Sequence, residues 1–243
     1  MEERLYQQFY NVEDDHWWFK ARRSILMTYL LQRVKVKTRL KLLDVGCGTG
    51  AFLAGASRHF DVYGTDNSSE AIKFCRQRGL GNLYEGTLEG YNSPTMFDVI
   101  TLLDVIEHID DDVGVLRRVR TLLGKGGHVL VTVPAYKWLW GAHDEVNHHK
   151  RRYTKTGLKN VVNDAGFFIE HISYFNTILF PVAAVRRMAA RLTHTREAED
   201  FEIPGTLTNA MLRSVFGVER YLLPYMSFPF GLSVLCWATR RLP

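Results

Sequence analysis

Short apolar runs alternate with longer amphipathic stretches along the middle of the chain. The apolar runs are typical of buried strands and occupy residues 40–45, 61–65, 82–84, 97–103, 127–133 and 167–175. Helical periodicity separates them near residues 51–60, 68–79, 112–123 and 154–165. Strands that alternate with helices in this way predict a doubly wound, mostly parallel α/β sheet with helices on both faces. In such a sheet the ligand binds at the carboxyl ends of the strands.

The alternation is absent at both ends of the chain. Residues 1–36 have helical periodicity with several aromatic positions, and residues 177–230 have no strand pattern before a last apolar run at 232–239. A connection of about fifty residues between neighbouring strands usually has structure or function of its own. We therefore expect an N-terminal helical lid segment (1–36), a core formed by 37–176 and 231–243, and a helical cap inserted at 177–230.

The last apolar run belongs to a stretch of nineteen residues without a charge, Tyr221–Thr239. A membrane-spanning helix needs about twenty apolar residues, so the length nearly suffices. However, Pro224, Pro229 and Gly231 interrupt the stretch, and the sheet needs a final strand. We expect this segment to supply that strand, and we expect any contact with a membrane to be peripheral.

Charge and cysteine content indicate which partners and which cellular compartment to expect. The formal net charge is +5, and basic residues cluster at 150–152 and between Arg186 and Arg196, directly before an acidic stretch at 197–202. Such clusters are usually solvated surface, so we do not expect nucleic acid as a partner. The three cysteines lack metal or redox spacing, and no apolar signal core follows Met1. We therefore expect a cytoplasmic protein with reduced thiols.

The strongest chemical signal is a glycine-rich segment after the first predicted strand. That strand runs directly into Gly46, Gly48 and Gly50, and the next apolar run leads to Asp66. Glycines let a backbone approach a ligand closely, and an acid at the end of the neighbouring strand binds ribose hydroxyls. The segment has neither the dinucleotide glycine spacing nor the lysine of a phosphate-binding loop. We predict a nucleoside ligand without phosphates.

Later segments agree with this prediction, and together they resemble class I S-adenosylmethionine-dependent methyltransferases. The segments that carry the resemblance are Asp44–Gly50, Val62–Asp66, Gly86–Glu89, Phe97–Ile100, Asp104–His108 and Leu122–Pro134. The resemblance implies a Rossmann-like fold whose seven-stranded, mostly parallel sheet has an antiparallel last strand. Residues 37–176 and 231–243 would form the cofactor-binding methyltransferase core, flanked by the helical N-terminal and cap segments.

The resemblance also implies that S-adenosylmethionine is the cofactor. Gly46 and Gly48 would hold its methionine part, and Asp66 would accept hydrogen bonds from both ribose hydroxyls. Thr87 stands where many relatives have an aspartate for the adenine, so the Leu88 backbone would provide much of that contact. The expected cofactor-binding residues are Arg22, Asp44, Gly46, Cys47, Gly48, Asp66, Asn67, Thr87, Leu88 and Asp104.

Two further segments, His16–Arg23 and His143–Thr154, resemble a group of bacterial methyltransferases of the type 11/12 class. In that group the first segment would close over the cofactor, with Arg22 near its carboxylate; the alternative is that its aromatic residues simply pack in the core. The second follows the fifth predicted strand, beside the acceptor pocket. Transfer to a hydroxyl requires removal of its proton, and histidine titrates near neutrality. His149 is the first candidate base and His143 the second; the alternative is that they are surface histidines near a helix start.

Asp104, Glu107 and His108 form an acid-x-x-Glu-His set that shares one face if the segment is a helical turn. Some ubiquinone-pathway and RNA O-methyltransferases resemble this set and use a divalent metal there. The same Glu-His pair also occurs in metal-free relatives, and the donor set suits magnesium or manganese poorly to moderately. We expect no metal, with Glu107 and His108 as the candidate ligands if one is bound.

Three functions fit these residues. The first is a methyltransferase that uses S-adenosylmethionine to methylate a small-molecule or lipid- or glycan-linked acceptor at oxygen, because the cap supplies apolar walls for a pocket. The alternative is an RNA methyltransferase that uses the basic clusters. A second alternative is an S-adenosylmethionine-binding protein without catalysis. The sequence does not determine the acceptor.

Overall fold

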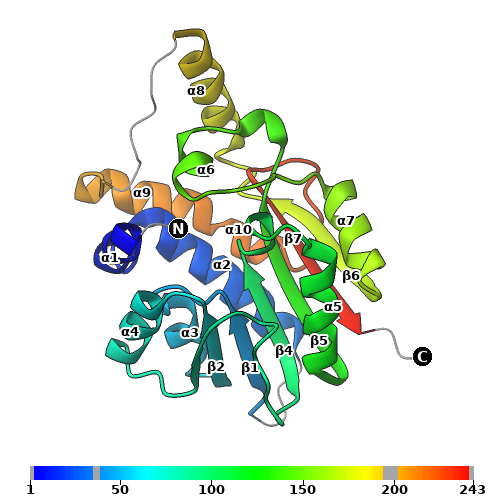
Figure 1. The fold of residues 1–243 in the computed structure, drawn as a ribbon. Helices are drawn as coiled ribbons and strands as arrows, with labels where there is room; N and C mark the ends of the chain where they lie inside the picture. Colours follow the sequence, from blue (N-terminus) through cyan, green and yellow to red (C-terminus); the bar gives the residue numbers. More distant parts are fainter. Residues whose placement is uncertain (1–2, 35–38, 194–201, 241–243) are drawn as a thin grey trace.

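A seven-stranded sheet forms the centre of the protein, in the order β3-β2-β1-β4-β5-β7-β6 (Figure 1). The computed structural model describes residues 3–34, 39–193 and 202–240, so Arg196 and residues 197–201 of the acidic stretch lie outside the described residues. The strands are β1 (Lys41–Val45), β2 (Asp61–Asp66), β3 (Leu83–Glu85), β4 (Phe97–Leu103), β5 (Leu123–Pro134), β6 (Phe167–Phe175) and β7 (Ser233–Arg240). β7 runs antiparallel to β5 and β6, and the other strand pairs are parallel. The predicted Rossmann-like sheet with an antiparallel last strand is confirmed.

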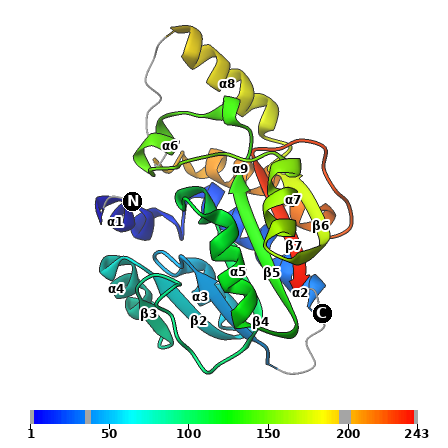
Figure 2. The ribbon, with the colours of Figure 1, turned by 45° about the vertical axis from the view of Figure 1, so that its right-hand side comes forward.

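Helices flank this sheet, and most of them cover one of its two faces. They are α1 (Glu3–Val12), α2 (Trp17–Arg33), α3 (Ala51–Ala56), α4 (Ser69–Gln77), α5 (Asp112–Leu122), α6 (Ala142–Val146), α7 (Lys155–Asp164), α8 (Phe180–Thr193), α9 (Thr206–Gly217) and α10 (Glu219–Leu222), with short 3₁₀ turns η1 (Ile106–His108) and η2 (Lys137–Leu139). One apolar cluster joins α5 and α7 to one face, and another joins α2, α3 and α4 to the opposite face (Figure 2). Loops lie at the carboxyl ends of the parallel strands.

Polar side chains determine where several helices begin. Ser68, Asp111 and Thr154 each accept a hydrogen bond from the backbone N–H three residues later, at 3.3, 2.8 and 3.0 Å. These bonds satisfy N–H groups that the first turn of a helix leaves unpaired. The predicted helix start near Thr154 is therefore correct, and the histidine segment before it is a loop with only the single short helix α6.

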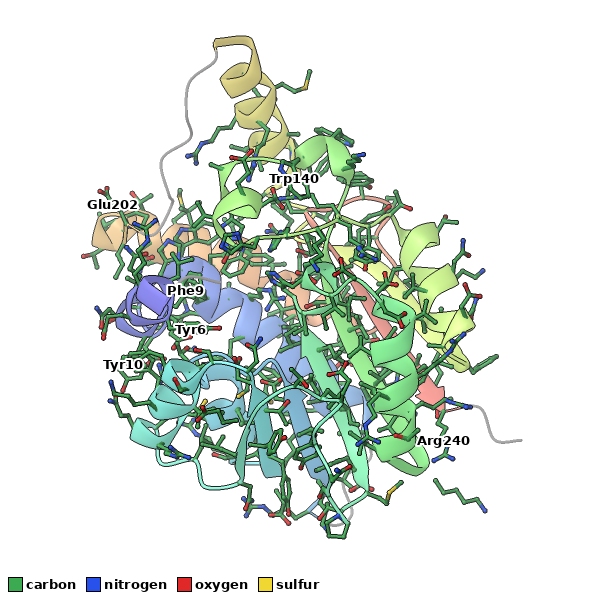
Figure 3. All side chains as sticks on the ribbon, viewed as in Figure 1. Tyr6, Phe9, Tyr10, Trp140, Glu202 and Arg240 are labelled. Atoms are coloured by element: carbon green, nitrogen blue, oxygen red, sulfur yellow. The ribbon has the colours of Figure 1, made fainter. Side chains whose placement is uncertain are left out.

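The N-terminal segment contains two helices with different surroundings. α2 buries Ile25 and Tyr29 against the sheet and so belongs to the helical layer. α1 packs on α4 instead: the ring of Tyr10, which is labelled in Figure 3, stacks on that of Phe74 with centroids 4.5 Å apart. α1 therefore lies apart from the helical layer that α2 joins; residues 1, 2, 35 and 36 of the expected lid segment lie outside the described residues.

The expected cap region contains α8, α9 and α10. α9 packs on α2, and Asn209 joins α9 to the α1–α2 junction: its Oδ1 accepts from the Trp17 N–H at 2.8 Å, and its Nδ2 donates to the Asp15 carbonyl at 3.0 Å. α8 projects away from the sheet (Figures 1 and 2). Among the described residues, no helix combines the length and apolar character needed to cross a membrane. The uncharged stretch at 221–239 supplies β7, as predicted.

Candidate active site

The glycine loop joins β1 to α3 at the carboxyl edge of the sheet. Gly46 and Gly48 have φ angles of 68° and 54°, in the left-handed region that other residues rarely adopt. A Cβ atom on Gly46 would lie 2.7 Å from Cγ2 of Val105. The N–H groups of Gly46 and Cys47 both donate to the Thr65 carbonyl, at 2.8 and 3.0 Å. The glycines therefore permit a tight turn between β1 and α3. Backbone groups, and not side chains, face the space next to Val105, which follows β4.

Asp66 ends β2 and links this loop to α4. Its Oδ2 accepts from the Gly48 N–H at 2.9 Å, and its Oδ1 accepts from the Ser68 N–H at 3.0 Å. The N-cap of α4 is Ser68, so Asp66 does not have that structural role. Burial raises the pKa of Asp66. Each carboxylate oxygen retains a second lone pair, which suits two hydroxyl donors. The neighbouring Asn67 is exposed.

Asp44 lies at the end of β1 and is buried. Thr101 Oγ1 donates to its Oδ1 at 2.6 Å. Burial, together with the charge of Asp66, raises the pKa of Asp44 to about 7. Because a positive charge favours the ionised form of a carboxyl, these two acids make the edge receptive to a cationic ligand. An ammonium or sulfonium group would supply that charge.

Arg22 reaches this edge from α2 and contacts the end of β4. Its Nη2 donates to Oδ2 of Asp104 at 2.7 Å and to Oγ1 of Thr132 at 2.8 Å. Thr132 in turn donates to Oδ1 of Asp104 at 3.1 Å. Asp104 has a φ of 58°, a strained conformation for a residue with a side chain. The structure thus pairs two of the expected cofactor residues, Arg22 and Asp104, directly with each other.

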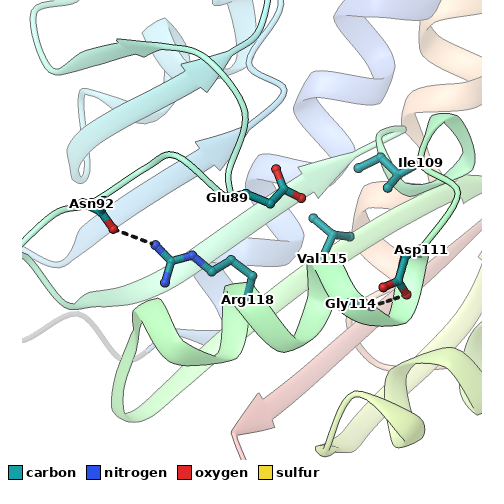
Figure 4. A pocket seen from close by; sticks show the side chains of 7 residues that line it. All are labelled: Glu89, Asn92, Ile109, Asp111, Gly114, Val115 and Arg118. Carbon is teal, nitrogen blue, oxygen red and sulfur yellow. Dashed lines mark hydrogen bonds between the residues drawn. The ribbon is translucent and has the colours of Figure 1, made fainter.

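The expected adenine loop follows β3. Leu88 is buried, and its carbonyl accepts from Nε of Arg118 at 3.4 Å, whereas Thr87 is exposed. Beside this loop lies an open pocket of about 440 Å³. It is lined by Glu89, Asn92, Ile109, Asp111, Gly114, Val115 and Arg118 (Figure 4). None of the expected cofactor or catalytic residues lines this pocket, so it lies beside the predicted site and does not coincide with it.

His149 forms a buried pair with Asp144 in the loop after β5. Its Nδ1 lies 2.8 Å from Oδ1 of Asp144. Arg152 donates to both carboxylate oxygens, from Nε at 2.7 Å and from Nη2 at 2.9 Å. Although burial opposes it, the hydrogen bonds from His149 and Arg152 hold the pKa of Asp144 well below its usual range. An ionised Asp144 accepts the Nδ1 proton and leaves Nε2 of His149 as a proton acceptor.

Two further histidines surround His149. The ring centroids of His108 and His143 lie 4.7 and 5.9 Å from that of His149. Burial is the largest cause that lowers the pKa of each of these two rings, to about 4. His108 and His143 are therefore neutral at pH 7. The two candidate bases, His143 and His149, lie together, and the Asp144 carboxylate orients His149.

Glu107 is fully buried beside these histidines. Neither of its carboxylate oxygens has a hydrogen-bond partner, and burial, with the nearby Asp104, raises its pKa well above the usual range. Glu107, His108 and His149 offer one ligand atom each, all within 4.8 Å of one another. One carboxylate and two imidazoles suit a divalent transition metal better than magnesium. The residues fit such an ion, so Glu107 and His108 remain candidate ligands, with His149 as the third.

The basic cluster at 150–152 is neutralised by acids of the same protein. Lys150 pairs with Asp110 at 2.5 Å, and Arg151 pairs with Asp112 at 3.0 Å. Arg152 is occupied by Asp144. These ion pairs hold the loop after β5 against α5 and α6. The basic cluster therefore has a structural role and does not require a bound anion from outside the protein.

Comparisons with known proteins identify the family of this chain. A family model described as a methyltransferase domain matches residues 16–172. The ubiquinone biosynthesis O-methyltransferase of Pectobacterium carotovorum is 32% identical over 109 residues, which cover 42% of this chain and 46% of that protein. That of Photorhabdus laumondii is 31% identical over 123 residues, covering 47% and 51%. The chain therefore matches about half the length of these curated relatives.

Solved structures share the fold at low sequence identity. A Mesorhizobium loti S-adenosylmethionine-dependent methyltransferase has a TM-score of 0.57 at 18% identity, covering 89% of this chain and 98% of that one. Haemonchus contortus phosphoethanolamine N-methyltransferase 2, in complex with S-adenosylmethionine, also has a TM-score of 0.57 at 18% identity, covering 89% and 52%. The family match and the strand order lead to one conclusion: this chain belongs to the methyltransferase domain family, in the type 11/12-like group of class I S-adenosylmethionine-dependent methyltransferases.

Proposed function

We propose that this protein transfers the methyl group of S-adenosylmethionine to a hydroxyl of a small-molecule or lipid- or glycan-linked acceptor, with His149 as the base. The observation that carries the proposal is the buried Asp144–His149 pair, which follows β5 at the same edge of the sheet as the glycine loop. The relatives named as O-methyltransferases support oxygen as the methylated atom.

S-Adenosylmethionine supplies a sulfonium methyl group with a good leaving group already in place. The chain has to align an acceptor oxygen with that methyl and take up its proton. Nε2 of His149 accepts the proton while Nδ1 stays bonded to Asp144, whose negative charge stabilises the imidazolium. Asp44 and Asp66 favour the cationic donor over the neutral thioether product, which carries no sulfonium charge. This difference promotes exchange of spent cofactor.

Aromatic residues in and around the loop after β5 support an apolar acceptor. The ring of Tyr136 lies 5.0 Å from that of Tyr174 and 5.9 Å from that of Phe180. Phe180 also packs against Trp138 and Phe230, at 6.0 and 5.3 Å between centroids. Together these rings connect the loop after β5 with the start of α8 and with the segment before β7. Such walls favour an acceptor with an apolar body and one reactive polar group.

Incubation with methyl-labelled S-adenosylmethionine and fractionated extract of the source cells tests the function. We expect label in the lipid or small-molecule fraction. Label in RNA would support the RNA methyltransferase instead, although the paired state of Lys150, Arg151 and Arg152 argues against RNA binding. If donor binds and no fraction is labelled, the protein is a binding protein without catalysis.

The second test removes metal. We expect methyl transfer to continue after dialysis against EDTA, because the Asp144–His149 pair supplies a base without an ion. Burial raises the pKa of Glu107 and so favours its neutral form, which needs no cation to balance it. Initial rates before and after dialysis provide the measurement. Loss of activity that manganese or zinc restores would contradict this prediction and would make His149 a metal ligand.

A further inference from the structure

Glu13 directly follows α1 and is a buried acid that the proposed methyl transfer does not use. The residue is 6% exposed. Its Oε1 accepts two hydrogen bonds, one from Thr49 Oγ1 at 2.5 Å and one from Nη2 of Arg78 at 2.7 Å. Burial raises the pKa of Glu13, and both of these bonds oppose that rise. Because burying a carboxylate without partners is strongly unfavourable, Thr49 and Arg78 account for its position.

Both partners of Glu13 belong to the glycine loop and its surroundings. Thr49 lies between Gly48 and Gly50 and is itself buried. Arg78 caps the end of α4, and its Nε donates to the Thr49 carbonyl at 2.9 Å. Glu13, Arg78 and Thr49 therefore form a closed ring of hydrogen bonds. This ring fixes both the side chain and the peptide group of the residue between the two glycines.

The same side of α1 reaches a second part of the expected donor site. Tyr6 and Tyr10 lie seven and three positions before Glu13, a spacing that places them on one side of a helix. Tyr6, labelled in Figure 3, is buried against α4. Burial and the negative charge of Asp66 both raise the pKa of Tyr6, so its hydroxyl lies near the carboxylate that ends β2. α1 therefore borders the expected donor site at two points, Tyr6 and Glu13.

An ordinary structural ion pair would hold α1 on α4 without involving the glycine loop. Asp14 forms such a pair: its Oδ2 accepts from Nη1 of the same Arg78 at 2.8 Å, and 55% of its side chain is exposed. Exposed pairs of this kind contribute little to stability. The carboxylate of Glu13 differs because it is buried and bonds directly to Thr49.

We propose that Glu13 is a positioning residue for donor binding. Through the hydroxyl of Thr49 it holds the glycine loop in the conformation that receives the methionine part of S-adenosylmethionine. A loop that is ordered before the donor arrives does not have to be ordered at the expense of affinity. Glu13 acts through Thr49 and need not touch the donor. The inference rests on the glycine loop as the donor site, and it does not depend on the acceptor, the base or the methylated atom.

Isothermal titration calorimetry with S-adenosylmethionine tests this role. Glu13→Ala should bind the donor at least about tenfold more weakly, because the loop must then be ordered on binding. Thr49→Val keeps the shape of the side chain without its hydroxyl and should cause a similar loss. The double variant Glu13→Ala/Thr49→Val should lose no more than the weaker-binding single variant, because both changes remove the same contact. Glu13→Gln should recover most of the affinity, since an amide oxygen still accepts from Thr49.

The matched control is Asp14→Ala, which removes an ion pair with Arg78 and leaves the bond between Glu13 and Thr49 in place. It should bind the donor as tightly as the wild type. Thermal unfolding of each variant without donor measures the contribution to stability separately. A lower unfolding temperature in Glu13→Ala with unchanged donor affinity would show a role in stability alone and would overturn the proposal.

Three other results would also overturn it. These are equal losses of affinity in Glu13→Ala and Asp14→Ala, losses that add in the double variant, and a wild-type affinity in Thr49→Val, which is decisive even if Glu13→Ala does not fold. The titrations contain no acceptor, so failure of the proposed methyl transfer would leave them unchanged. A wild type that binds no donor would overturn both the role of Glu13 and the donor site.

Discussion

Replacing His149 by alanine is expected to lower the rate of methyl transfer by about a hundredfold or more, which is the usual contribution of a positioned general base. The surroundings of His149 suit it to accept a proton, because Nδ1 bonds to Asp144 and the neighbouring rings of His108 and His143 are neutral at pH 7. Initial rates at saturating donor and acceptor provide the measurement. Asp144→Asn should also reduce the rate, because an amide no longer stabilises the imidazolium.

The control for this variant is His59→Ala, which removes an exposed histidine after α3. It should retain the rate of the wild type. Donor affinity, measured by calorimetry, should be unchanged in His149→Ala, so that the loss appears in kcat. A normal rate in His149→Ala together with a loss in His143→Ala would transfer the role of base to His143.

Replacing Asp66 by alanine is expected to weaken binding of S-adenosylmethionine by at least about a hundredfold, since a hydrogen bond to a charged group contributes about 1.5–3 kcal/mol and two ribose hydroxyls would be lost. The variant also removes the acceptor for the Gly48 N–H, so the glycine loop loses a contact that holds its shape. Isothermal titration calorimetry with S-adenosylmethionine and with S-adenosylhomocysteine measures both affinities.

Asp61→Ala is the matched control, because Asp61 begins the same strand and is exposed at the opposite end. It should bind the donor as tightly as the wild type. Asp66→Asn should have an intermediate affinity, since an amide oxygen accepts one of the two hydroxyls. If Asp66→Ala binds normally, or if the wild type binds no donor at all, the assignment of this edge of the sheet as the donor site is wrong.

Much of the fold could be predicted because its signals are local. The apolar runs at 97–103 and 167–175 correspond to β4 and β6 without a shift. The strand at 232–239 was expected to end the sheet, and β7 lies there, one residue later at each end. The glycine loop could also be predicted, because its tight turn needs positive φ angles and glycine adopts them readily. Gly46 and Gly48 have such angles in the structure.

The surroundings of α2 could not be predicted in the same way. Its aromatic and apolar residues are typical of a lid and of a buried helix alike, and periodicity does not distinguish them. The structure places Ile25 and Tyr29 against the sheet, which makes α2 part of the core layer. Only the contacts of α2 with segments far away in the sequence show whether it is a lid or a buried helix.

Several site residues were missed for a related reason. Asp144 stood next to a candidate base in the sequence, but nothing local revealed that its carboxylate turns toward His149 and Arg152. Thr132 is a polar residue in the apolar run 129–133 of β5, and its bonds to Arg22 and Asp104 join three segments of the chain. A threonine in a buried strand next to an acid at the neighbouring strand end is the signal that could have suggested it.

The bonds of Asn209 have a consequence for turnover. They fasten the junction between α1 and α2 to α9, at Asp15 and Trp17. A movement of α1 relative to α2 would therefore have to break these bonds or carry α9 with it. If the donor enters beside α1, we expect one substrate to alter the dissociation rate of the other, because α9 would move with the donor entrance.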